Sequence, residues 1–237
     1  MDRFLSGKHA IVTGGTRGIG RAIVAALAGA GARVVFCGRT ATAVDRAVAE
    51  LTAESGGEIA GMVADVRDRD QVLALFEFAD RTYGVPQIVV NNAGLGVFAP
   101  AAKFAVEDYR LVMETNLTGV FHCCQAALAR FIPNGGGFII NISSLAAKNP
   151  FAGGSVYNAS KFALNGFTEA LMLDHRHDNV RVCSIMPGSV DTGFSGSARS
   201  SWKIAPEDVA EVVLSVLRMP ERTMISRVEI RPSRPAK

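Results

Sequence analysis

The chain lacks the long apolar segments of a membrane protein. None of its 237 residues falls in a run approaching the roughly 18 apolar residues of a membrane-spanning helix. The first eight residues, MDRFLSGK, show no apolar signal-peptide core. The formal net charge of +3 is too small to indicate binding to nucleic acid or to an anionic membrane surface. We therefore expect a cytoplasmic protein.

Disulfide and metal-binding patterns are also lacking. The chain has four cysteines, none with C-x-x-C spacing, and three of them lie in or beside apolar runs, where a cysteine behaves as a small hydrophobe. Two of the four histidines, His175 and His177, are two residues apart and would not share a helix face. We expect reduced thiols and no metal site.

Repeats, low-complexity segments and linkers rich in Pro, Gly or Ser are missing, so nothing divides the chain. Short β-branched runs instead alternate with longer segments of helical spacing, which favours a parallel sheet with right-handed crossovers. We predict one domain over residues 1–237, an α/β fold of the doubly wound, Rossmann-like type, with a seven-stranded, mostly parallel sheet and helices on both faces. The predicted strands are 9–13, 33–38, 58–64, 87–91, 137–142, 180–185 and 225–230, and the predicted helices are 18–30, 43–54, 69–83, 107–131, 156–176 and 206–217.

Ligands of such folds bind at the carboxyl ends of the strands, and glycines cluster after the first of them, in TGGTRGIG (13–20). The loop opens a helix, whose backbone N–H groups attract a pyrophosphate. Gly14 would permit the tight turn, Gly18 would let the ligand come close, and Gly20 would let the helix pack on the sheet. The spacing is not the common G-x-G-x-x-G fingerprint, and a purely structural turn is the alternative.

An acidic residue is missing where NAD-binding units carry one. Such units place it about 20 residues after the glycine loop, on the ribose 2′-hydroxyl, but this chain reads FCGRT (36–40) there. Arg39 and Thr40 could meet a 2′-phosphate instead, together with Arg17 from the glycine loop, because guanidinium groups bind phosphate through strong charge-assisted hydrogen bonds. We predict NADP(H) as the cofactor. The alternative is that Arg39 is an ordinary surface residue.

Tyr157 and Lys161 lie four residues apart in YNASK, within a predicted helix, and so share one face. An adjacent ammonium favours the phenolate and lowers the pKa of a tyrosine, which makes the pair a candidate proton donor for a carbonyl oxygen. Ser144 follows a strand, 13 residues before Tyr157, and could hydrogen-bond the same oxygen. Asn116 lies inside predicted helix 107–131 despite its low helix propensity; it either makes a specific hydrogen bond or is exposed.

These motifs resemble, in order and spacing, those of the short-chain dehydrogenase/reductase family. They are TGGTRGIG, NNAG (91–94), Asn116, SS (143–144), YNASK and PGSVDT (187–192), and the resemblance extends from about residue 6 to 217. It implies an NADP(H)-dependent oxidoreductase that transfers a hydride between the nicotinamide and a ketone or secondary alcohol. A non-catalytic sensor of dinucleotides is the alternative, although such proteins tend to have lost the Tyr–Lys pair.

The resemblance also implies roles. Tyr157 is similar to the general acid/base of the family, and Lys161 to the residue that lowers its pKa and holds the nicotinamide ribose. Ser144 resembles the ligand of the substrate oxygen, with Ser143 supporting the loop, and Asn116 resembles the residue that distorts its helix and anchors a proton-relay water. The implied cofactor contacts are Gly14, Thr16, Arg17, Gly18, Ile19, Gly20, Arg39, Thr40, Asp65 and Val66 (at the adenine), Asn92, Ala93 and Gly94 (beside the ribose), Tyr157, Lys161, Pro187, Gly188, and Val190 and Thr192 (at the carboxamide).

The loops after the strands predict the substrate pocket. Its candidate residues are Leu95, Val97, Phe98, Phe151, Phe194 and Trp202, with Lys148, Arg199 and Lys203. The apolar set favours a ketone with a hydrocarbon neighbour, unless these residues only pack the loops. Many similar bacterial family members reduce 3-oxoacyl thioesters on an acyl-carrier protein, but the C-terminal RTMISRVEIRPSRP departs from their glycine-rich end, and this puts an acyl-thioester substrate in doubt.

Two features predict self-association. Val228 and Ile230 alternate with charged residues, as in a strand buried on one face at the edge of a sheet. Predicted helices 107–131 and 156–176 carry more apolar residues than one sheet contact needs. Similar family members form dimers through these helices and tetramers through the last strand, so we expect a homodimer or homotetramer. The alternative is that these residues fill the core of a monomer.

Overall fold

The computed structural model describes residues 3–192, 194 and 200–235. In this part of the chain, seven parallel strands form one sheet with the order β3-β2-β1-β4-β5-β6-β7. This is the Rossmann order 3-2-1-4-5-6 with a seventh strand beside β6, and it confirms the predicted seven-stranded, doubly wound sheet. The strands are β1 (His9–Thr13), β2 (Arg33–Gly38), β3 (Ile59–Val63), β4 (Ile88–Asn91), β5 (Gly137–Ile142), β6 (Val180–Pro187) and β7 (Arg227–Ile230).

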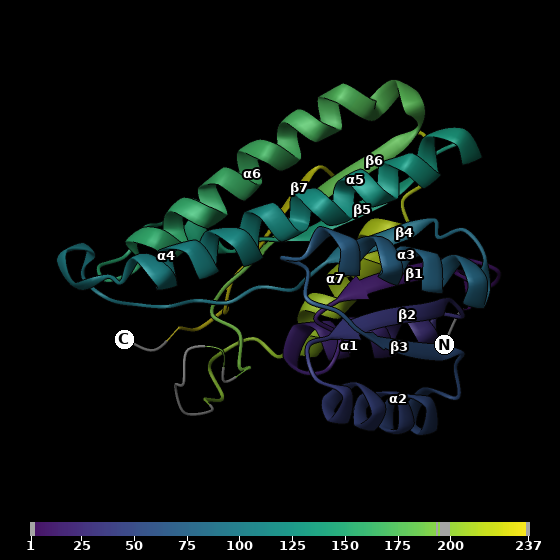
Figure 1. Ribbon diagram of the computed structural model, residues 1–237, viewed down its shortest axis with the longest axis horizontal. Helices are drawn as coiled ribbons and strands as arrows, with labels where there is room; N and C mark the ends of the chain where they lie inside the picture. Colours follow the sequence, from purple (N-terminus) through teal and green to yellow (C-terminus); the bar gives the residue numbers. More distant parts are fainter. Residues whose placement is uncertain (1–2, 193, 195–199, 236–237) are drawn as a thin grey trace.

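Helices cover both faces of the sheet (Figure 1). Helices α1, α2 and α7 pack in one core, and α3, α5 and α6 pack in the other. The helices are α1 (Gly18–Gly29), α2 (Ala41–Ser55), α3 (Arg69–Tyr83), α4 (Val106–Met113), α5 (Gly119–Phe131), α6 (Ser155–His175) and α7 (Pro206–Leu217). Among the described residues, none of these helices is both long and apolar enough to cross a membrane.

The central strands are apolar along their whole length because both of their faces are buried. In β1, Ala10 and Val12 face the core of α1, α2 and α7, while Ile11 between them faces the other core. All three side chains are fully buried. Continuous apolar runs of this kind distinguish parallel strands from the half-exposed strands of antiparallel sheets.

Predicted helix 107–131 needs a correction, because it is not one regular helix. Its middle, Glu114–Thr118, forms a π-helical turn that separates α4 from α5. The buried Asn116 lies in this turn. A π turn holds one more residue than an α turn, and it is a common feature of functional sites.

The order of the strands reverses at β1, which lies between β2 and β4. The crossover connections leave toward opposite faces on the two sides of this point, so the loops at the carboxyl ends of β1 and β4 separate and leave space for a ligand. The glycine loop follows β1, and the NNAG segment begins at the end of β4. Both therefore border this space.

Candidate active site

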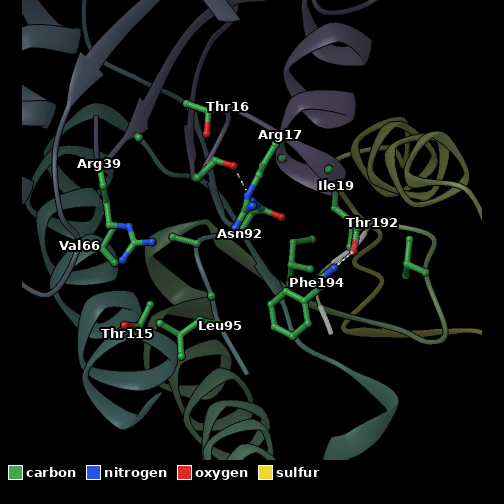
Figure 2. Close-up of a pocket in the computed structure, with 18 of the residues that line it drawn as sticks. Thr16, Arg17, Ile19, Arg39, Val66, Asn92, Leu95, Thr115, Thr192 and Phe194 are labelled. Atoms are coloured by element: carbon green, nitrogen blue, oxygen red, sulfur yellow. Dashed lines mark hydrogen bonds between the residues drawn. The ribbon is translucent and has the colours of Figure 1, made fainter. Parts of the chain in front are cut away.

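A cavity of about 720 Å³ opens at the carboxyl ends of the strands. Figure 2 shows Arg39, Val66, Leu95 and Thr115 along one side and Ile19, Thr192 and Phe194 along the other. All the residues predicted to contact the cofactor line it, and so does Ser144. The lining residues that the sequence did not single out as site residues are Cys37, Gly38, Ala43, Arg46, Ala64, Thr115, Ile142 and Ser189.

The glycine loop brings the N-terminus of α1 to the cavity. Gly14 and Gly18 have φ values of +68° and +55°, which side chains rarely adopt. The conformation of Gly18 is thus what requires glycine there, rather than the close approach of a ligand alone. Arg17 is the N-cap residue of α1, and within the described chain its side chain makes no capping hydrogen bond. The first N–H groups of the helix are therefore available to an anion.

Gly20 lets the first turn of α1 pack closely against the segments that follow β1 and β4. A Cβ there would lie 2.2 Å from the carbonyl oxygen of Gly14 and 2.4 Å from Nδ2 of Asn92. Asn92 Nδ2 donates to the carbonyl oxygens of Thr13 and Gly14, at 2.9 and 3.1 Å. Thr13 Oγ1 accepts in return from the backbone N–H groups of Asn92 and Ala93, both at 3.0 Å. These bonds hold the ends of β1 and β4 at a fixed separation.

Three arginines line the cavity. Arg17 comes from the glycine loop, Arg39 from the end of β2, and Arg46 from α2. Arg46 was not predicted, although it lies one helical turn beyond Ala43, which also lines the cavity, so helical spacing could have revealed it. The predicted adenine residue Asp65 is already paired: Arg67 contacts its carboxylate at 2.6 Å, and this hydrogen bond lowers the pKa of Asp65.

Tyr157, Lys161 and Ser144 gather where α6 meets the end of β5. Tyr157 and Lys161 are 9% and 5% exposed. Lys161 Nζ donates to the carbonyl oxygen of Ile142 at 3.0 Å and lies 5.9 Å from the centroid of the Tyr157 ring. Ser144 Oγ accepts from the N–H of Ala146 at 3.1 Å. The hydroxyl of Ser144 keeps its own proton for donation, and it also hydrogen-bonds Tyr157.

The pKa of Tyr157 differs in direction from the sequence prediction. Burial raises it above its ordinary value, and a hydrogen bond with Ser144 lowers it in part. Desolvation disfavours the charged phenolate, and this outweighs the hydrogen bond. Burial also lowers the pKa of Lys161, to about 8. Tyr157 is thus a neutral hydroxyl at neutral pH.

Ser143 does not support the loop through its side chain as predicted. Its backbone N–H donates to the carbonyl of Ile185 at 2.7 Å. Its Oγ is buried and has no hydrogen-bond partner among the described residues. Ser143 lines the cavity, although its hydroxyl oxygen is itself buried.

Asn116 lies behind the cavity rather than in its described lining. Its Oδ1 accepts from the N–H of Leu95, and its Nδ2 donates to the carbonyl of Leu95, both at 2.9 Å. Nδ2 also lies 3.0 Å from Ser160 Oγ on α6. Asn116 therefore makes specific hydrogen bonds, which decides between the two alternatives left open by the sequence. Its role in anchoring a relay water stays a prediction.

The predicted substrate-pocket residues divide into groups. Leu95, Phe194 and Lys203 line the cavity. Phe98 contacts the Tyr157 ring, and Phe151 contacts Phe98. Lys148 pairs with Glu229 of β7 at 2.7 Å, and Arg199 lies outside the described residues.

Comparisons with known proteins identify one family. The family model described as short chain dehydrogenase matches residues 8–202. An uncharacterized oxidoreductase of Staphylococcus aureus (strain N315) is 31% identical over 96% of this chain and 98% of its own. A tropinone reductase homolog of Arabidopsis thaliana is 37% identical over 84% of this chain and 74% of its own.

Two solved structures are similar over nearly the whole chain. One is a metagenomic short-chain oxidoreductase in complex with NADP, with a TM-score of 0.86 and 34% identity over 98% of this chain and 99% of its own. The other is an alcohol dehydrogenase from the archaeon Thermococcus sibiricus complexed with 5-hydroxy-NADP, with a TM-score of 0.89 and 28% identity over 97% of this chain and 99% of its own.

Proposed function

The chain belongs to the short-chain dehydrogenase family, and from this premise we propose that it is an NADP(H)-dependent oxidoreductase that interconverts a ketone and a secondary alcohol. One observation carries the proposal. Tyr157, Lys161 and Ser144 line the same cavity as the glycine loop and the uncapped N-terminus of α1. A candidate proton donor and a candidate dinucleotide-binding loop thus line the same cavity.

The lining fits a dinucleotide phosphate. The first turn of α1 offers N–H groups to the pyrophosphate. Arg17, Arg39 and Arg46 would hold a 2′-phosphate, and no acidic residue occurs between Phe36 and Thr40 to favour a free 2′-hydroxyl. The two similar solved structures, whose titles name NADP and 5-hydroxy-NADP, support the same preference.

Each polar group near Tyr157 has a distinct task. The Tyr157 hydroxyl, kept neutral by burial, gives its proton to the ketone oxygen. Ser144, which hydrogen-bonds Tyr157, donates its proton to the same ketone oxygen and polarises the carbonyl. When bound, the reduced dinucleotide supplies the hydride that the carbonyl carbon accepts. The Lys161 ammonium stabilises the phenolate that proton transfer leaves behind, and its remaining N–H groups would hold the ribose hydroxyls of the bound dinucleotide.

Asn116 acts as a positioning residue in this proposal. It fixes both backbone groups of Leu95, which lines the cavity, and it contacts Ser160, the neighbour of Lys161. A fixed geometry at these two positions keeps the substrate and the reacting groups aligned.

Self-association is part of the proposal. Large apolar side chains on α4, α5 and α6 remain exposed, with Phe121 at 45% and Phe162 at 48%. By contrast, the edge strand β7 is bordered by ion pairs, from Lys148 to Glu229 and from Arg227 to Glu169. Charged groups at a sheet edge oppose pairing with another strand. We therefore favour a homodimer through the helices over a tetramer through β7.

The experiment that tests the function follows NADPH absorbance with a panel of ketones, including a 3-oxoacyl thioester. Turnover with at least one simple ketone supports the reductase. A protein that binds NADPH tightly but consumes none with any carbonyl compound is a sensor, and the reductase proposal is then wrong.

A further inference from the structure

Two phenylalanines contact the ring of the proton donor, and a third contacts one of these two. The ring of Phe98 lies 5.6 Å from the Tyr157 ring, centroid to centroid, at an interplanar angle of 73°. Phe194 lies 5.9 Å from the Tyr157 ring at 55°, and Phe151 lies 5.7 Å from Phe98 at 52°. These three residues, the phenylalanine trio, come from three different loops. Phe194 is beside Thr192 at the wall of the cavity (Figure 2).

The rings of the trio pack closely against the backbone at two glycines. A Cβ at Gly96 would lie 2.6 Å from the Phe98 ring and 3.0 Å from the Phe194 ring. A Cβ at Gly154 would lie 2.5 Å from the Phe151 ring. The two loops that carry Phe98 and Phe151 are also joined, because the N–H of Ala99 donates to the carbonyl of Gly153 at 2.9 Å. The rings are therefore held in place.

The trio is left partly open to solvent. Phe98, Phe151 and Phe194 are 40%, 47% and 45% exposed, whereas Tyr157 between them is 9% exposed. Exposed apolar surface is unfavourable in proportion to its area, and proton transfer by Tyr157 makes no use of these side chains. Aromatic surface beside the ring of the proton donor is what a substrate with matching surface would cover.

We propose that the phenylalanine trio binds an aryl ketone, in which an aromatic ring is attached directly to the carbonyl carbon. This inference rests on the proposed function. With the ketone oxygen at Tyr157, a ring one bond from the carbonyl carbon reaches the trio and adds a further tilted or edge-on partner to it. Reduction consumes the hydride of NADPH and the proton of Tyr157, and yields the 1-aryl alcohol and NADP⁺.

An alkyl chain would gain burial from the same surface but not the interaction between rings. Each aromatic pair adds roughly 2- to 10-fold in affinity beyond area burial. A substrate ring that contacts two members of the trio should therefore be preferred by about 10-fold or more over a saturated ring of the same size.

The test compares acetophenone with cyclohexyl methyl ketone, which has the same number of carbon atoms, and with 2-octanone as a linear ketone. The kcat/KM values are measured for the unmodified protein and for Phe98→Leu, Phe151→Leu and Phe121→Leu. Phe121 is the matched control, because it is 45% exposed on α5 and its ring contacts Phe167 and His122 instead of Tyr157. Ligand-observed NMR with the same ketones and NADP⁺ measures binding independently of turnover.

We expect acetophenone to exceed cyclohexyl methyl ketone by about 10-fold in kcat/KM and in binding. Phe98→Leu and Phe151→Leu should each reduce that ratio several-fold, and Phe121→Leu should leave it unchanged. Equal use of the two ring ketones, a preference for 2-octanone, or a ratio that neither variant moves overturns the inference. If no ketone is turned over, the reductase proposal fails, and the NMR ratio still decides whether the trio selects aryl groups.

Discussion

The ammonium nitrogen of Lys161 lies 5.9 Å from the centroid of the Tyr157 ring. Both side chains come from one face of α6, four residues apart, and both are buried. Burial acts on the two groups in opposite directions, because it raises the pKa of Tyr157 and lowers the pKa of Lys161 to about 8. Desolvation favours the neutral form of each group. The site therefore holds a buried cation at a cost in stability.

Because of Lys161, the free energy of unfolding should change with pH in the alkaline range. Its pKa is about 8 in the folded protein against 10.5 as the ordinary value, so between these values the unfolded chain binds the extra proton and stability rises with pH. A difference of this size is on the order of 3 kcal/mol. In cofactor-free protein, urea unfolding from pH 7 to 10.5 should show this rise, and Lys161→Met should lack it. Lys103→Met, at an exposed lysine, is the control and should behave as the unmodified protein.

Tyr157→Phe should abolish turnover and preserve the fold. The change removes the proton donor but keeps the ring among Phe98 and Phe194, so kcat should fall by roughly 100-fold or more. NADPH binding, followed by fluorescence titration, should persist. Tyr109→Phe, at a half-exposed tyrosine of α4, should retain full activity. Turnover near that of the unmodified protein with every ketone would remove Tyr157 from the mechanism.

The two neighbouring serines should respond differently. Ser144→Ala should lower kcat by roughly 100-fold, as the loss of a donor to the substrate oxygen typically does. It also removes the hydrogen bond that lowers the pKa of Tyr157, so the rising limb of alcohol oxidation should move to higher pH. Ser143→Ala should cost less activity and leave the melting temperature unchanged or higher, because its Oγ lacks a partner among the described residues. If Ser143→Ala lost more activity than Ser144→Ala, Ser143 rather than Ser144 would be the donor to the substrate oxygen.

The arginines near β2 should set the cofactor preference. Arg39→Ser should raise the KM for NADPH by about 10- to 100-fold, which corresponds to the loss of a hydrogen bond to a charged group, and should leave the KM for NADH nearly unchanged. Arg46→Ser should act in the same direction. Arg81→Ser, on an exposed part of α3, is the matched control. Equal kcat/KM for both cofactors in the unmodified protein would contradict the assignment.

The exposed apolar side chains of α5 and α6 should be buried at the interface of a homodimer. Light scattering at micromolar concentration should give about twice the 25.0 kDa of one chain. Phe121→Glu should produce a monomer, because it places a charge in the interface, while Val63→Glu on the edge strand β3, where Val63 is also exposed, should not. A mass of one chain for the unmodified protein would rule out the dimer.

Much of the fold and of the candidate site could be predicted because it is encoded locally. Strands and helices follow from periodicity, and the structure confirms the predicted sheet with small changes at element ends, such as β6 continuing to Pro187. The glycine loop spans only eight residues, and Tyr157 and Lys161 lie only four residues apart, so each motif can be recognised in a short stretch of sequence. Parallel strands then bring their carboxyl ends together, so motifs far apart in sequence converge by topology alone.

Only the tertiary structure decided features that depend on which side chains meet. Arg46 lines the same cavity as Arg17 and Arg39 because α2 begins at Ala41, directly after the end of β2. The direction of the Tyr157 pKa depends on how completely neighbouring loops exclude water from it. Phe98, Phe151 and Phe194 form one aromatic surface only where three loops meet at Tyr157. Sequence periodicity records which residues are apolar, whereas desolvation and ring contacts depend on distances between segments that the sequence does not state.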